Sequence, residues 1–144
     1  MLRFVVCFSL LCFVGCQSNT KPLPDGAPPL TPATAKVTYQ GSPLADALVV
    51  FAPKEGKIGG SGKTDANGLV QLQAYPPHEG IPFGEYQVMI TKSESVEVPG
   101  GDPDNRQTKT NFLIPQKYGN PTKSGLTATV AQQGDQVFTF ELKD

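Results

Sequence analysis

The sequence predicts an all-β fold, a sandwich of about seven strands, and three observations support it. After residue 33, apolar residues recur at every second position in short runs, as they do on strands with one face in a core. Turn-forming residues separate the runs, and the 15 glycines and 14 prolines would interrupt helices repeatedly. Residues 34–144 also have the length of one small domain with a single core.

The apolar runs follow one another along this domain with a turn signal between them. In chain order they occupy residues 37–39, 47–51, 70–72, 86–90, 126–130 and 138–142. Residues 47–51 are apolar at every position, so we expect both faces of that strand to be covered, and Pro53 ends it. The last two runs flank the turn residues 132–135, and we expect them to form the clearest hairpin of the chain.

The N-terminal residues predict a leader. Arg3 precedes a short apolar run that ends in Val14, Gly15 and Cys16. This run is well under the ~20 apolar residues of a spanning helix, so we expect no permanent transmembrane helix. A small residue directly before Cys is similar to a bacterial lipoprotein signal, although Phe13 stands where Leu is usual. We therefore expect residues 1–15 to be removed and Cys16 to be lipidated; the alternative is an ordinary secretory peptide with an incidental thiol.

Lipidation at Cys16 carries further expectations about location and redox chemistry. Removal of the leader takes Cys7 and Cys12 with it, so no intrachain disulfide is expected. A diacylglyceryl group, which such lipoproteins typically carry, provides the two chains that stable attachment requires. Gln17 follows Cys16, whereas lipoproteins retained at the inner membrane often have Asp there. We expect a cell-envelope location, at the outer membrane facing the periplasm or the surface.

Residues 16–33 are dense in proline and lack apolar periodicity, which predicts a linker. In polyproline II, at ~3.1 Å per residue, such a segment holds the domain as much as roughly 50 Å from the membrane. The alternative is a peptide ligand for a proline-recognition domain, but the same spacing arises readily in linkers.

Charge limits the partners. The chain has 12 basic and 13 acidic residues, and loss of Arg3 with the leader makes it slightly more acidic. No basic stripe is present, so we expect neither nucleic acid as a partner nor electrostatic membrane binding. The expected partners are the membrane, through the lipid on Cys16, and an envelope protein or a glycan.

Four segments in order resemble the carboxypeptidase regulatory-like domain: residues 36–44, 47–51, 64–68 and 84–88. Three later segments are similar to small lipoproteins of the planctomycete type: residues 114–121, 124–127 and 138–142. The resemblance covers nearly the whole mature domain and implies a Greek-key β-sandwich of the transthyretin-like (prealbumin-like) fold. Residues 93–111 form a polar stretch that is longer than the usual connection. The family is named for its fold, and a fold does not determine function.

Several residues of these segments have structural reasons to be present. Residues 65–68, Asp-Ala-Asn-Gly, predict a turn in which Asp and Asn cap backbone amides and Gly adopts a positive φ. Tyr86 and Tyr118 are expected to bury their rings and to hydrogen-bond to backbone, as tyrosines in sandwich corners do.

Motifs that suggest a binding site fail on spacing. Residues 56–64 suggest a phosphate-binding loop, but Lys57 stands where the pattern requires Gly, and a turn and a strand are expected in place of the helix. Two sets of oxygen-bearing side chains lack the spacing and the distal Glu of a calcium loop: Asp65 with Asn67, and Asp102 with Asp104 and Asn105. No cofactor or dedicated metal site is therefore expected.

The sequence also offers no catalytic set. His78 is the only histidine, so a zinc site of His and Cys ligands cannot be assembled, and no Gly-x-Ser-x-Gly motif supports a triad. The hydroxyisourate hydrolase type, an enzyme with the implied fold, uses several His and Arg residues. We expect a non-enzymatic envelope module; the alternatives are a carbohydrate- or peptide-binding accessory domain and an unrecognised periplasmic hydrolase.

Overall fold

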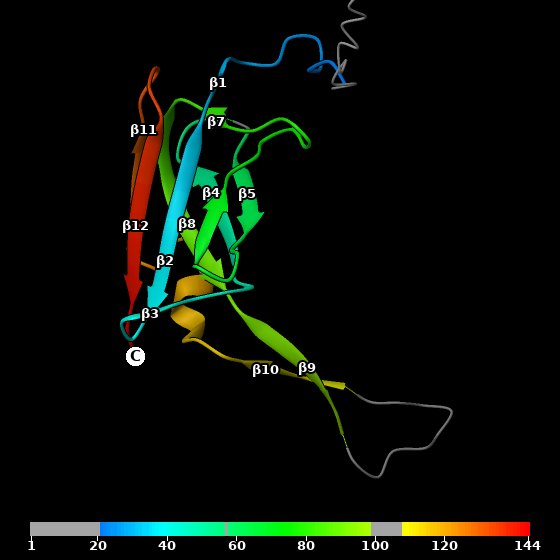
Figure 1. Ribbon diagram of the computed structural model, residues 1–144, viewed down its shortest axis with the longest axis vertical. Coiled ribbons are helices and arrows are strands. Elements are labelled where there is room, and N and C mark those ends of the chain that lie inside the picture. Colours follow the sequence, from blue (N-terminus) through cyan, green and yellow to red (C-terminus); the bar gives the residue numbers. More distant parts are fainter. Residues whose placement is uncertain (1–20, 57, 99–107) are drawn as a thin grey trace, which may run out of the picture.

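In the computed structural model, which describes residues 21–56, 58–98 and 108–144, the chain forms two β-sheets packed face to face (Figure 1). The first sheet has the order β11 (Leu126–Val130), β8 (Gly84–Thr91), β4 (Leu48–Pro53) and β5 (Gly60–Lys63), with all neighbours antiparallel. In the second, β2 (Ala33–Tyr39) pairs with β12 (Gln136–Leu142), β3 (Ser42–Pro43) and β6 (Leu69–Gln71). The predicted all-β sandwich is confirmed.

Smaller elements lie at the two ends of the sandwich. At one end, β1 (Leu30–Thr31) pairs with β7 (Ile81–Pro82), so the folded unit includes the last residues of the segment 16–33. At the other end, β9 (Ser93–Glu97) and β10 (Thr108–Phe112) form a ribbon, and a single 3₁₀ turn, η1 (Gln116–Gly119), follows it. No helix in the described residues is long and apolar enough to span a bilayer.

The core lies between the sheets and is centred on Phe51, whose side chain is 0% exposed. Its ring centroid lies 5.8 Å from Tyr86 of the same sheet. From the facing sheet, the ring centroids of Phe138 and Phe140 on β12 lie 5.5 and 6.1 Å away. Aromatic pairs at these distances add to the burial of apolar surface. Phe51 therefore connects the two layers.

The predicted hairpin of the last two runs is wrong. The strands β11 and β12 lie in different sheets: β11 pairs with β8, and β12 runs parallel to β2. Each strand has one apolar face, and both faces are buried because the strands face each other across the core. A period of two shows which face of a strand is buried but not which strand lies beside it.

The expectation that residues 47–51 are covered on both faces is also wrong. Val49 and Phe51 are fully buried, but Leu48 is 47% exposed. The strand β4 is central in the hydrogen-bonding order and still has only one face toward the core. A β-branched or aliphatic side chain on the outer face is compatible with a strand that has neighbours on both edges.

The predicted turn at residues 65–68 is confirmed in its main features. One carboxylate oxygen of Asp65 accepts hydrogen bonds from the backbone N–H groups of Asn67 and Leu69, at 2.8 and 2.9 Å. Gly68 has a φ of 74°, and a Cβ built there would lie 2.3 Å from the carbonyl oxygen of Val37. Glycine therefore allows both the turn and the close approach of this loop to β2.

Both tyrosines take the predicted positions. The Tyr86 hydroxyl donates to the carbonyl of Pro82 at 2.6 Å, and the Tyr118 hydroxyl donates to the carbonyl of Lys143 at 2.8 Å. Both side chains are buried. Burial raises the pKa of the Tyr86 hydroxyl above its usual value, because the charged phenolate would lose its solvation in the core.

Candidate functional site

The ribbon of β9 and β10, here called the arm, projects from the end of the sandwich (Figure 1). Only Lys92 separates it from β8, and all ten residues of its two strands are exposed. The backbone N–H of Leu113 donates to the carbonyl of Lys92 at 2.9 Å, which closes the arm at its base. The polar stretch 93–111 thus supplies two paired strands; its residues 99–107 lie outside the described part of the chain. A two-stranded ribbon has little stability by itself, so the sandwich supports the arm.

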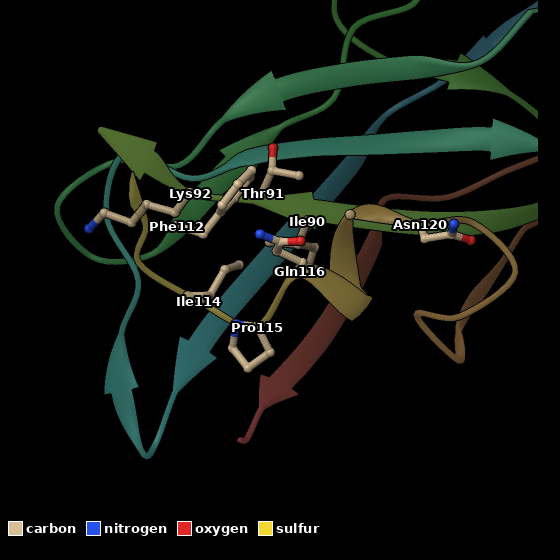
Figure 2. Close-up of a pocket in the computed structure, with 9 residues that line it drawn as sticks. Ile90, Thr91, Lys92, Phe112, Ile114, Pro115, Gln116 and Asn120 are labelled. Carbon is tan, nitrogen blue, oxygen red and sulfur yellow. The ribbon is translucent and has the colours of Figure 1, made fainter. Parts of the chain in front are cut away.

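A cavity of about 300 Å³ lies where the arm meets the sandwich, and we call it the arm-base pocket (Figure 2). Its lining residues come from β8, β10 and the segment around η1: Ile90, Thr91, Lys92, Phe112, Ile114, Pro115, Gln116, Gly119 and Asn120. The Phe112 ring remains 46% exposed and offers an apolar surface to a partner.

The segment around η1 is fixed on the sandwich by Tyr118 and Gly119. The Tyr118 hydroxyl donates to the carbonyl of Lys143 and accepts from the N–H of the same residue at 3.0 Å. A Cβ built on Gly119 would lie 2.8 Å from the Thr91 methyl carbon, so the turn approaches β8 closely. These contacts hold one wall of the pocket in place without a ligand.

The polar side chains of the pocket are those of Thr91, Lys92, Gln116 and Asn120. In Figure 2 the Gln116 amide lies among the apolar side chains, whereas the Lys92 ammonium and the Asn120 amide lie at opposite ends of the lining. The side-chain oxygen of Asn120, Oδ1, accepts hydrogen bonds from the Thr122 hydroxyl and backbone N–H at 2.7 and 3.0 Å, so its amide supports the following turn. Gln116 can donate and accept hydrogen bonds, but it cannot transfer a proton at neutral pH. The lining can bind a partner and offers no general acid–base pair.

Of the residues singled out in the sequence, few come together in the fold. Cys16 lies outside the described residues, as do Asp102, Asp104 and Asn105. The Asp65 carboxylate is occupied by backbone amides. His78 closes the turn that begins at Tyr75, and its Nε2 is buried without a hydrogen-bond partner. Among the described residues, no three His, Cys, Asp or Glu side chains gather in a way that could hold a metal ion.

Phe112 and Gln116 did not emerge from the sequence as site residues. Their contact with the end of β8 joins segments that are far apart in the chain, and a period-two pattern does not report such contacts. The available signal is Phe112 itself, because a large apolar residue at the end of a long polar stretch is unusual.

Comparisons with known proteins give only distant likenesses. No family model matches the chain, and no curated protein matches it. The structure is similar to the major pilin subunit of Bacillus cereus, with a TM-score of 0.45 and 16% identity over 80% of this chain. It is also similar to a 9R-lipoxygenase from Cyanothece PCC8801, with a TM-score of 0.38 and 16% identity over 87% of this chain. The chain spans 30% of the pilin subunit and 18% of the lipoxygenase.

Proposed function

We propose that the protein is a non-enzymatic, lipid-anchored module of the cell envelope that binds an envelope protein or a glycan through the arm and the arm-base pocket. One observation carries the proposal. The N-terminal segment joins the sandwich at the end where β1 pairs with β7, and β8 then leads the chain to the opposite end, where the arm projects (Figure 1). With the chain anchored at Cys16, the arm is the part farthest from the membrane.

Two further points support this function. The arm presents four exposed apolar side chains at or beside its strands, namely Val96, Val98, Phe112 and Leu113. The register of the ribbon places Phe112 on one face and Val96 and Val98 on the other, so both faces of the arm offer apolar contact to a partner. The pocket beside Phe112 combines apolar side chains with a hydroxyl, an ammonium and two amides but no acid–base pair, a composition suited to binding rather than to catalysis.

The proposal places the domain among carboxypeptidase regulatory-like domains of the transthyretin-like fold. The order of its segments supports this assignment, as does the Asp65 to Gly68 turn between the two sheets. It also places the lipid-bearing protein at the outer membrane, facing the periplasm or the surface, because Gln17 follows Cys16.

The anchor is tested by Cys16→Ser. We expect the wild-type protein to sediment with membranes and the variant to move almost entirely to the soluble fraction, because serine cannot accept the lipid and the domain after the leader has no basic stripe to bind a membrane. The measurement is fractionation of cells followed by immunoblotting. Cys12→Ser is the matched control, since that residue leaves with the leader, and it should remain with the membranes. A Cys16→Ser protein that still sediments with membranes would contradict lipid anchoring.

The binding surface is tested by cross-linking in intact cells. A photoreactive phenylalanine analogue placed at Phe112 should yield an adduct of higher mass after irradiation, because that ring is exposed beside the pocket. The same analogue at Leu48, which is equally exposed on the outer face of β4, serves as the control and should yield none. Equal adducts at both positions, or none at Phe112, would argue against the arm as the binding surface.

A further inference from the structure

The opposite end of the sandwich holds a second cavity, independent of the arm. Phe83 lies between β7 and β8, and its ring is 49% exposed. Beside it is a cavity of about 520 Å³ lined by Lys54, Glu55, Phe83, Gly84 and Glu85. We propose that this cavity is a saccharide-binding site that takes a neutral or amino-bearing sugar.

The local backbone explains why the Phe83 ring is not in the core. Ile81, Pro82 and Tyr86 are buried on either side of it. Between them Gly84 has a φ of 146°, a conformation that residues with a side chain rarely adopt. A Cβ built on Gly84 would meet no atom within 4 Å, so the absent side chain leaves open space beside the ring. Glycine here both turns the chain and keeps one side of the cavity free.

The polar groups of the cavity supply hydrogen-bond donors and acceptors together. The Lys54 ammonium forms an ion pair with the Glu85 carboxylate at 3.0 Å, and the Lys54 backbone N–H donates to the Glu85 carbonyl at 2.9 Å. Glu55 brings a second carboxylate to the lining. Sugar hydroxyls can donate to both carboxylates and accept from the ammonium, while the C–H face of the sugar ring lies against Phe83.

The charge of the cavity lining limits which ligands with an apolar face and hydrogen-bonding groups can bind. The lining has one cation and two carboxylates, so it repels acidic sugars such as uronic acids. A cationic peptide would also meet an aromatic ring and carboxylates, but its flexible side chains lack the rigid C–H face with which a sugar ring covers Phe83. A neutral or amino-bearing saccharide uses all three polar side chains and the ring, and it leaves the ion pair intact.

The experiment uses the full-length protein, purified from membranes in a zwitterionic detergent that contains no sugar. Saturation-transfer NMR and calorimetry are carried out with cellotriose, chitotriose, the chitosan trimer, trigalacturonate and trilysine. We expect at least one of the neutral or amino-bearing trisaccharides to bind at ~10 mM or below, and trigalacturonate and trilysine not to bind. Phe83→Ala should weaken that binding about tenfold, Glu85→Gln should weaken it as well, and Phe83→Tyr should retain it because the ring is kept.

The matched control is Leu48→Ala, which removes an equally exposed apolar side chain from the outer face of β4 and should leave saccharide binding unchanged. Thermal unfolding of each variant confirms that the fold is retained. Failure of all three neutral or amino-bearing trisaccharides to bind, or unchanged binding in Phe83→Ala, would overturn the proposal. Binding of trilysine in place of the sugars would show a peptide site and would overturn it equally.

Discussion

Replacing Phe51 with Ala is expected to lower the free energy of unfolding by ~3–5 kcal/mol. The Phe51 ring is fully buried and contacts aromatic rings from both sheets, so its removal leaves a cavity at the centre of the core. Small domains have a total stability of about 5–15 kcal/mol, so this loss removes a large part of it. Urea unfolding followed by circular dichroism measures the change.

The matched control for Phe51→Ala lies on the same strand. Leu48→Ala removes an apolar side chain that points away from the core and is 47% exposed, so we expect a loss of less than about 1 kcal/mol. The comparison tests directly whether only one face of β4 is buried. If the two substitutions cost the same, β4 would be covered on both faces, as its uniformly apolar sequence suggests, and the observed packing of this sheet would be contradicted.

The contrast at β4 shows which parts of the fold the sequence can predict. Alternation identified the buried faces of β2, β8 and β12, because a strand exposes alternate side chains to opposite sides. The Asp65 turn could be predicted because its hydrogen bonds join residues at most four positions apart. Burial of Tyr86 followed from its place on an alternating strand, and its bond to Pro82 is likewise local.

What the sequence did not predict depends on contacts between distant segments. The parallel pairing of β12 with β2 joins residues about a hundred positions apart, and β12 would have buried the same face if it had formed a hairpin with β11. The arm-base pocket requires Gly119 to approach Thr91, and neither residue type signals this contact. The exposure of Phe83 and Phe112 opposes the general tendency of aromatic residues to be buried. Exposed aromatic rings therefore mark the two candidate sites, but only the fold identifies them as exposed.

Replacing Thr64 with Val is expected to destabilise the protein by about 2–4 kcal/mol, although the two side chains have nearly the same shape. Thr64 is 3% exposed, and its hydroxyl donates to the carbonyl of Leu44 at 2.6 Å and accepts from the N–H of Ala47 at 2.9 Å. Valine fills the same space but leaves a buried donor and a buried acceptor unsatisfied. Each such group costs roughly 1–3 kcal/mol.

Two further substitutions separate the hydroxyl from the packing. Thr64→Ser keeps the hydrogen bonds and loses one methyl group, so it should cost only about 1 kcal/mol and be more stable than Thr64→Val. Thr127→Val makes the same change on an exposed position of β11, where the side chain faces solvent and the expected effect is below about 0.5 kcal/mol. A Thr64→Val protein as stable as the wild type would contradict the observed hydrogen bonds. Those bonds hold the loop from Leu44 to Ala47, which passes from one sheet to the other, against the start of the Asp65 turn. If stability rises from Thr64→Val to Thr64→Ser to the wild type, the attachment of this loop depends on one buried hydroxyl.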